Sequence, residues 1–235
     1  MSAPIEAVIF DWGGTLTPWH DIDFEAEAMS YAAAYGDREL AARFLEEATA
    51  SWARAREQHS SARVEEILVA AGADVAGDAH RAGLAAYRDF WEPHTLTDPQ
   101  VRPLWEGLRA KGIRVGVLSN TIWDRDYHRG IFERDGVLDL IDGDVYSSEI
   151  PWVKPHASAF RAAADAVGTD PARCVYVGDR LFEDVHGPQQ VGMRAIWIPH
   201  SVLPEAQVVA TEAQPDAVAH ELLEILAIVD GWQGA

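Results

Sequence analysis

Hydrophobic residues follow two different patterns along the chain. Residues 5–10 (IEAVIF) form a short run rich in β-branched residues that ends at Asp11 and a Gly-Gly pair, which predicts a strand followed by a tight loop. From about residue 23 to residue 93 the apolar positions recur at helical spacing. The glycines and candidate N-caps in this stretch predict four helices, over 23–34, 37–58, 62–71 and 78–91. This part of the chain is therefore expected to be all-helical.

The remainder of the chain alternates between helical and strand-like segments. Helices are expected over 98–110, 125–134, 156–167, 182–191 and 216–229, and strands over 113–118, 144–147, 173–177 and 194–198. Such βα alternation predicts a parallel sheet with helices on both faces. The sequence thus indicates an α/β fold in which residues 1–17 and 95–235 form the sheet-containing core and residues 18–94 form an inserted four-helix domain.

Charge and composition narrow the class of partner. The 235 residues include 19 basic and 38 acidic side chains, a formal charge of −19 that would repel a polyanion, so we expect no nucleic-acid partner. No apolar run reaches the roughly 18–20 residues of a membrane helix, and no basic segment precedes the first apolar run. We therefore expect no membrane partner and a cytoplasmic location. Cys174 is the only cysteine and is expected to be a buried, inert thiol.

Chemically unusual residues follow each predicted strand. Ligands bind beyond the carboxyl ends of strands in parallel sheets, so these residues should converge. They combine a carboxylate nucleophile, hard oxygen ligands for Mg²⁺ and groups that neutralise phosphoryl oxygens, in the order Asp11, Ser119, Lys154, Asp179 and Asp184. Each residue alone is weak evidence, because an isolated Asp at a strand end is more often a cap or a turn former, and an isolated Ser or Lys can be a turn residue or a surface charge. The ordered set is what indicates phosphoryl transfer.

At this point the sequence resembles the haloacid dehalogenase superfamily. Its members carry an Asp nucleophile in a DxxxT loop, a Ser or Thr after the second strand, a Lys before a helix and a closing acidic pair. The matching segments here are VIFDWGGTL, VGVLSN, VKPHASAF and VYVGDRLFEDVHGPQQVGM. The resemblance implies a Rossmann-like core with a C1-type helical cap that closes over the site and selects the substrate.

The resemblance also implies a role for each site residue. Asp11 would attack the substrate and form a covalent aspartyl intermediate, assisted by Ser119 and Lys154 as catalytic groups. The expected Mg²⁺ ligands are Asp11, the Gly13 carbonyl, Asp179 and Asp184. The expected substrate contacts are Trp12, Gly14, Ser119, Asn120 and Lys154. The expected activity is hydrolysis of a small phosphorylated metabolite.

One position departs from the pattern of the family's phosphatases. They usually carry a second Asp two residues after the nucleophile, which protonates the leaving alcohol and then activates water, whereas this chain has Gly13. General acid–base catalysis typically contributes about 10²–10⁴-fold. A phosphatase would therefore need its acid from elsewhere, with His20, Asp21 and Asp23 as candidates, or a substrate with a good leaving group.

Three alternatives follow from Gly13. Carbon–halogen hydrolases of the superfamily also lack the second Asp, but they generally need no metal and their acidic pair is altered, whereas Asp179 and Asp184 remain here. Phosphonoacetaldehyde hydrolase has a similar loop but uses a cap lysine, and residues 18–94 contain none. The third alternative is a binding protein that has kept the fold and lost catalytic turnover.

Four tryptophans are expected on loops around the strand ends. They are Trp12, Trp19, Trp123 and Trp152. Such residues either stack on a substrate or pack between cap and core, and we favour packing because tryptophan buries a large apolar area. Trp105 and Trp197 lie within an expected helix and an expected strand, and both are interpreted as core residues.

Overall fold

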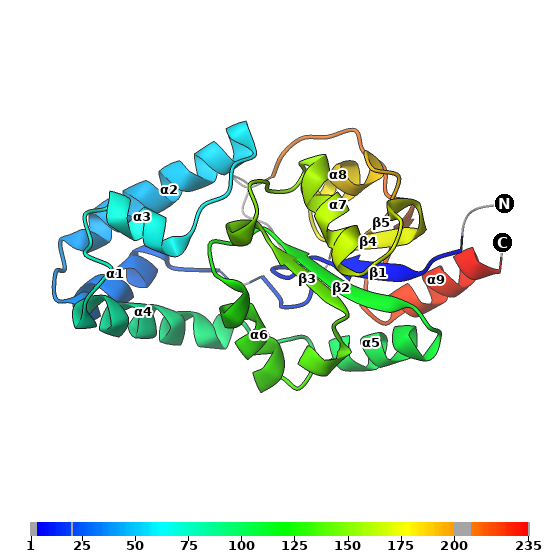
Figure 1. The fold of residues 1–235 in the computed structure, drawn as a ribbon, viewed down its shortest axis with the longest axis horizontal. Coiled ribbons are helices and arrows are strands. Elements are labelled where there is room, and N and C mark those ends of the chain that lie inside the picture. The colour runs from blue at the N-terminus through cyan, green and yellow to red at the C-terminus, as the bar shows by residue number, and fades with distance from the viewer. Residues whose placement is uncertain (1–3, 20, 200–207, 235) are drawn as a thin grey trace.

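The computed structural model describes residues 4–19, 21–199 and 208–234 (Figure 1). The described residues contain a parallel sheet with the strand order β3-β2-β1-β4-β5-β6. The strands are β1 (Ala7–Phe10), β2 (Arg114–Ser119), β3 (Gly143–Tyr146), β4 (Cys174–Gly178), β5 (Arg194–Trp197) and β6 (Ala217–Val218). The chain builds outward from β1 to β3 and then returns to the other side of β1 for β4. This reversal beside β1 is where ligands bind in doubly wound sheets.

Alternation along the strands assigns the two faces of the sheet. In β1, Val8 and Phe10 belong to one buried cluster and Ala7 and Ile9 to another, as the two-residue period of a strand requires. The first cluster includes residues of α5 (Val101–Ala110), α6 (Arg125–Arg134) and α9 (Glu224–Gln233), and the second includes residues of α7 (Ala157–Ala166). Helices therefore cover both faces, and the predicted α/β class is confirmed.

Four helices are inserted between β1 and α5 and form a separate group at one end of the molecule (Figure 1). They are α1 (Phe24–Tyr35), α2 (Leu40–Gln58), α3 (Val64–Ala70) and α4 (Asp78–Trp91). Their apolar faces share a separate buried cluster that includes Tyr31, Phe44 and Leu68. The expectation of an all-helical insertion is confirmed, and we call these four helices the cap. None of the helices in the described residues is both long enough and apolar enough to cross a membrane.

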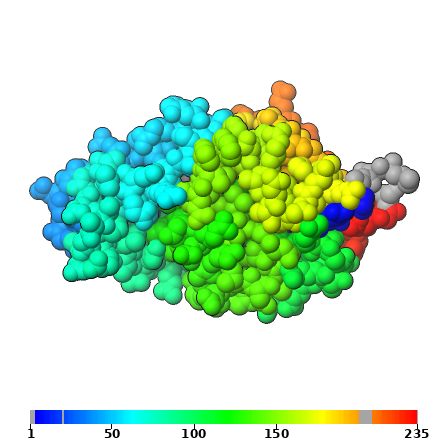
Figure 2. Space-filling model, in the orientation of Figure 1, coloured from blue at the N-terminus to red at the C-terminus, as the bar shows by residue number. Residues whose placement is uncertain are grey.

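Backbone and side-chain hydrogen bonds join the cap to the core at the segment between α2 and α3. Val153 N donates to His59 O (3.3 Å), Ser61 Oγ donates to Ile150 O (2.6 Å) and Arg63 Nε donates to Ser148 O (2.9 Å). Figure 2 shows the cyan cap packed against the green core over the face in view. The cap is thereby held against the loop that leads to Lys154.

Two expected helices differ in the structure. The helix expected over 216–229 begins only at Glu224, because Asp216 N donates to Ala195 O, Asp216 Oδ2 accepts from Ala195 N, and the next residues add β6 to the sheet. The helix expected over 182–191 is a π-helical turn, η5 (Leu181–His186), followed by the short α8 (Gly187–Gln189). Proline at position 188 has no backbone N–H and is favoured in the first turn of α8 rather than inside a continuous helix.

Candidate active site

The site lies at the carboxyl ends of β1, β2 and β4. Phe10 is opposite Val117 of β2 and Val177 of β4, so Asp11, directly after β1, lies between the ends of both neighbours. Asp11 N donates to Val177 O (2.9 Å), which continues the ladder by one residue, and the side chain of Asp11 is buried. The reversal of strand order therefore places this carboxylate at the ligand-binding edge.

Lys154 occupies the centre of a buried charge cluster. Its Nζ lies 2.8 Å from Asp11 Oδ1 and 2.7 Å from Asp184 Oδ1, and it also donates to the Tyr176 hydroxyl (2.9 Å). Burial alone would lower the pKa of Lys154, but Asp11 and Asp184 outweigh it and raise the pKa above the ordinary lysine value. Lys154 is therefore a fixed cation beside the nucleophile candidate, not a solvated surface charge.

Asp11, Asp179 and Asp184 form a buried acidic group in which one oxygen of each lies within 4.8 Å of the others. Both carboxylate oxygens of Asp179 are buried without a hydrogen-bond partner. Burial, with the charges of Asp184 and Asp11, raises the pKa of Asp179 well above its usual value, and burial raises the pKa of Asp184 to about 7 against the opposing effect of Lys154. Unpaired buried oxygens among like charges are the environment that a bound cation would relieve, so this group could hold a metal.

Two glycines allow these carboxylates to approach the backbone. Gly14 has φ of +84°, and a Cβ there would lie 2.4 Å from Asp179 Oδ2. A Cβ on Gly178 would lie 2.3 Å from the Asp184 carboxyl carbon. The π-helical turn η5 places Asp184 in this contact, where its Oδ2 accepts from Arg180 N (3.0 Å). The acidic group is therefore built around positions that no other residue type fits without displacement.

Ser119 and Asn120 lie at the end of β2 beside Lys154. Ser119 is buried and lines the same cavity as Asp11. The Asn120 side chain is engaged twice, because its Nδ2 donates to Lys154 O (3.1 Å) and its Oδ1 accepts from Lys154 N (2.8 Å). The Asn120 amide thus holds the backbone of Lys154, a link that the sequence pattern did not predict.

Gly13 lines the cavity and leaves open space beside Asp11. A Cβ built on Gly13 meets no atom within 4 Å, and its φ is not in the left-handed region. Of the residues expected to compensate for the missing acid, Asp23 is exposed and caps α1 through a hydrogen bond from Ala26 N (2.9 Å), and neither it nor the exposed Asp21 lines the cavity. His20 lies outside the described residues.

A cavity of about 270 Å³ extends from Asp11 into the cap. Trp12, Trp19 and Trp123 line it, whereas Trp152 is absent from its lining and stacks on His156 with ring centroids 5.8 Å apart. Trp123 is buried in the cluster that the cap helices share, which agrees with the expected packing between cap and core. The site therefore opens into a space that several aromatic rings line.

Three residues at the site were not found from the sequence. Tyr176 receives the hydrogen bond from Lys154 and donates to Leu118 O (2.8 Å), so its hydroxyl bridges two strand ends. Trp197 is only partly buried and donates from Nε1 to Asp179 O (2.9 Å), so it is more than the core residue expected. Glu27 of α1 lines the cavity from the cap side. The sequence offers a weak signal for Tyr176, because its position in β4 puts its side chain on the sheet face that α7 covers. No local feature of the sequence distinguishes Glu27.

Comparison with known proteins places this site in a family. The sequence profile of the haloacid dehalogenase-like hydrolases matches residues 5–192. The glyceraldehyde 3-phosphate phosphatase of Methanopyrus kandleri is 28% identical over 96% of this chain and 97% of its own length. The phosphoserine phosphatase of Thermus thermophilus is 28% identical over 54% of this chain and 49% of its own length.

Solved structures resemble the whole chain at lower identity. A haloacid dehalogenase-superfamily phosphatase from Thermococcus onnurineus and a 2-haloacid dehalogenase from Pseudomonas syringae each share 23% identity and a TM-score of 0.66, covering 97% of this chain and 99% of theirs. At this identity the likeness establishes the fold, which phosphatases and dehalogenases share. The choice between these activities therefore depends on the site.

Proposed function

The chain belongs to the haloacid dehalogenase-like hydrolases, and we propose that it is a magnesium-dependent phosphatase acting on a small phosphorylated metabolite. The observation that supports this most is the buried group of Asp11, Asp179 and Asp184 around Lys154, in which both oxygens of Asp179 lack a partner. Relatives named as phosphatases, one of them along nearly the whole chain, support the same activity. In this proposal residues 18–94 form the cap and the remaining residues form the catalytic core.

The expected metal ligands are Asp11, the Gly13 carbonyl, Asp179 and Asp184, a set of hard oxygen donors that suits Mg²⁺. When bound, the ion supplies positive charge against the phosphoryl oxygens and the acidic group. Without a bound metal ion, burial raises the pKa of Asp179 and Asp184, and the charges of Asp184 and Asp11 raise the pKa of Asp179 further. The residues present therefore fit the ion that the family implies.

Asp11 is the proposed nucleophile. Lys154 Nζ holds Asp11 Oδ1, and Oδ2 accepts no hydrogen bond from the described residues, so Oδ2 is available to attack phosphorus. The bond from Oδ2 to phosphorus forms as the bond from phosphorus to the leaving oxygen breaks, and Lys154 and Ser119 stabilise the charge on the non-bridging oxygens. Water then attacks the same phosphorus, which releases phosphate and restores the Asp11 carboxylate.

Gly13 determines which phosphate esters this site hydrolyses well. Since no side chain at this position protonates the leaving oxygen, substrates whose leaving group needs no proton should react fastest. Asp21 and Asp23 are exposed and do not line the cavity, so neither replaces the acid in this arrangement. We expect acyl phosphates and aryl phosphates to be hydrolysed faster than simple alkyl phosphates.

Carbon–halogen hydrolysis is the second candidate, and Gly13 is the observation that favours it. Halide leaves without a proton, so a missing acid is no handicap there. The paired, buried carboxylates of Asp179 and Asp184 disfavour it, because an anionic haloacid would approach three carboxylates with one lysine to offset them.

Phosphate release from a panel of acyl, aryl and alkyl phosphates, with Mg²⁺ or with EDTA, tests the proposal. We expect release that requires Mg²⁺ and that is lost in Asp11→Asn. Release of chloride from short 2-haloacids, with no phosphate released from any panel member, would replace the proposal with the dehalogenase alternative. No turnover of either class would indicate a binding protein.

A further inference from the structure

The cap side of the cavity is lined by aromatic, aliphatic and hydroxyl side chains and contains a single charged side chain among the described residues, Glu27. The two lining cations, Lys154 and Arg180, both come from the core. The largest lining residues of the cap are Phe24, Phe44, Trp52, Tyr87 and Trp91. A single negative charge in an apolar wall needs an explanation, because burying a charge without a partner is costly.

Glu27 is held in a fixed position by two donors. Tyr87 Oη (2.5 Å) and Trp91 Nε1 (2.8 Å) both donate to Glu27 Oε1. Oε2 accepts no hydrogen bond from the described residues, and no salt bridge to Glu27 occurs among them. Burial raises the pKa of Glu27, and the two hydrogen bonds act in the opposite direction. One oxygen is thus fully engaged and the other is left for a ligand.

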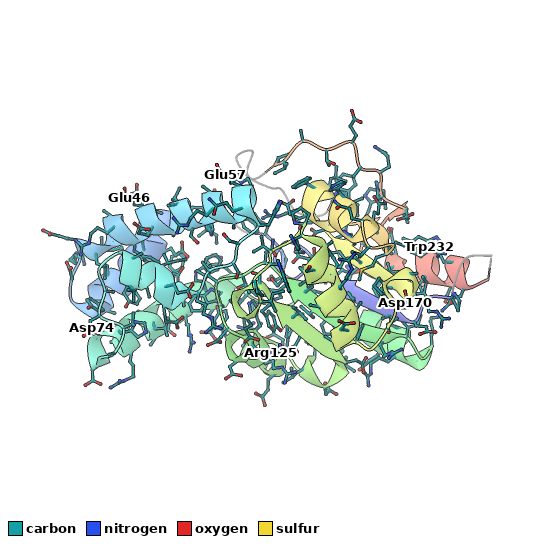
Figure 3. The ribbon with its side chains drawn as sticks, turned by 45° about the horizontal axis from the view of Figure 1, so that its top comes forward. Glu46, Glu57, Asp74, Arg125, Asp170 and Trp232 are labelled. Carbon is teal, nitrogen blue, oxygen red and sulfur yellow. The ribbon has the colours of Figure 1, made fainter. Side chains whose placement is uncertain are left out.

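Other acidic residues of the cap are placed differently. Glu46 and Glu57 lie on the outer side of α2 and point away from the molecule (Figure 3), and both are exposed. Glu27, a residue of α1, is only 8% exposed, and its carboxylate faces α4. A link between these two helices would need only an acceptor for Tyr87 and Trp91, which a glutamine provides as well as a glutamate. The negative charge itself therefore points to something beyond helix packing.

A cation is the ligand that fits this wall. The faces of aromatic rings attract positive charge, most strongly where water is excluded, and a desolvated carboxylate adds direct attraction. Arg88 lies 5.8 Å from the ring centre of Trp123 and 5.6 Å from that of Tyr127, but Arg88 is not among the residues that line the cavity. A neutral ligand would leave the Glu27 carboxylate without a counter-charge, and an anionic group would be repelled.

We propose that Glu27 and the aromatic wall around it bind an ammonium group on the leaving alcohol, so that the substrate class is the phosphate monoester of an amino or quaternary-ammonium alcohol. The nearby cationic nitrogen makes such an alcohol more acidic than a simple alkyl alcohol, so it leaves more readily where Gly13 supplies no proton. This assignment rests on the proposed phosphatase function, with the phosphoryl group at Asp11 and the ammonium group at Glu27 in the same cavity. The volume of about 270 Å³ suits a small alcohol, since it is below the range usual for drug-sized ligands.

Matched substrates that differ only in charge test this proposal. Phosphocholine carries a trimethylammonium group, and 3,3-dimethylbutyl phosphate replaces its nitrogen with carbon at nearly the same shape. We expect kcat/KM to favour phosphocholine by about tenfold or more, because a desolvated cation is bound by both the rings and Glu27. Longer ω-trimethylammonio alkyl phosphates and their carbon analogues show which spacing joins the two ends of the cavity.

Glu27→Gln separates recognition from the intrinsic reactivity of the two esters. Glutamine keeps an acceptor for Tyr87 and Trp91 but has no charge, so the ratio of kcat/KM for the ammonium ester to kcat/KM for the neutral ester should fall by about tenfold. Glu46→Gln is the matched control, since it neutralises an exposed glutamate of the cap that does not line the cavity, and it should keep the preference. Thermal melts of both variants show whether the cap remains folded.

The outcomes separate this inference from the proposed function. Mg²⁺-dependent hydrolysis of p-nitrophenyl phosphate with no preference for the ammonium ester at any spacing would overturn the inference alone. So would a preference that persists in Glu27→Gln. If no phosphate ester is hydrolysed, the phosphatase proposal fails, and calorimetric titration of the same ligand pairs then decides. Tighter binding of the ammonium ligand that is lost in Glu27→Gln supports the subsite, and equal binding overturns it.

Discussion

The two ends of the cavity are built by opposite means. At the core end, charged residues from strand ends and adjoining loops are packed so closely that Lys154 contacts two carboxylates and two glycines leave no room for a Cβ. At the cap end, helices present aromatic rings and one carboxylate. At the core end, Lys154 lies within about 3 Å of two carboxylates, which fixes the positions of the proposed reacting groups. The cap end instead presents an apolar surface with one negative charge. In the proposed function, different parts of the chain would therefore supply the chemistry and the choice of substrate.

Replacement of Lys154 should have the largest effect. Lys154→Met removes the cation from between Asp11 and Asp184, and we expect kcat/KM for phosphate esters to fall by about 10³-fold, because charge stabilisation at the phosphoryl oxygens is lost. Lys111→Met is a matched control, since Lys111 is the other lysine of the chain and pairs with Asp230 near the C-terminus. Steady-state phosphate release checks both, and equal activity of the two variants would remove Lys154 from the site.

An acid restored at position 13 should increase activity. Because Gly13 has open space at its Cβ, Gly13→Asp should raise kcat/KM for alkyl phosphates by about 10²-fold and should change kcat/KM for aryl phosphates much less. Gly14→Ala, one residue on, should abolish activity, because its Cβ would collide with Asp179 Oδ2 at a φ of +84°. A fall in alkyl phosphatase activity for Gly13→Asp would show that the acid comes from another group.

Replacement of Trp197 should weaken Mg²⁺ binding more than it slows the chemical step. Trp197→Phe removes the hydrogen bond to Asp179 O, and we expect the Mg²⁺ concentration for half-maximal activity to rise by about tenfold, with kcat at saturating Mg²⁺ nearly unchanged. Trp232→Phe provides the control, because Trp232 lies in α9 under Arg194 (Figure 3). An unaltered Mg²⁺ dependence in Trp197→Phe would mean that Asp179 is positioned without it.

The acidic group should make stability depend on pH and Mg²⁺. The pKa values of Asp179 and Asp184 are raised by burial, so the folded protein without metal retains protons that the unfolded chain has lost. Its free energy of unfolding therefore falls as pH rises from the ordinary aspartate range through about 7. Mg²⁺ should raise Tm by about 5 °C, and more at pH 8 than at pH 6.

Differential scanning calorimetry at several pH values, with Mg²⁺ or EDTA, measures this effect. Asp179→Asn should reduce both the pH dependence and the stabilisation by Mg²⁺. Glu46→Gln, at an exposed position on α2, should reduce neither. A Tm that rises with pH in EDTA would contradict the assigned charge states.

The fold and the core end of the site were accessible from the sequence because their signals are local. The periodicity of apolar residues predicted the alternating helices and strands. Each catalytic candidate follows a predicted strand directly or within a short spacing. Parallel pairing on both sides of β1 then brings Asp11, Ser119 and Asp179 to one edge without any information about side-chain packing.

The features that were missed depend on contacts between distant segments. Residues 217–218 are too short to signal a strand and form β6 only because Asp216 pairs with Ala195. Glu27 lies on an amphipathic helix among other acidic residues, and only packing against Tyr87 and Trp91 distinguishes it. Trp197 has the ordinary pattern of a strand residue, and its link to Asp179 appears only when β5 is placed beside β4.

The most direct test of the central claim is the covalent state of Asp11 during turnover. Wild-type protein is mixed with acetyl phosphate and Mg²⁺, quenched in acid, and analysed by intact-mass and peptide mass spectrometry. We expect one added phosphoryl group on the peptide containing Asp11, absent in EDTA and in Asp11→Asn. Its decay should be slow, because Gly13 supplies no base to activate water. Phosphate release from wild-type protein with no such adduct, or with the adduct on another residue, would show that Asp11 is not the nucleophile.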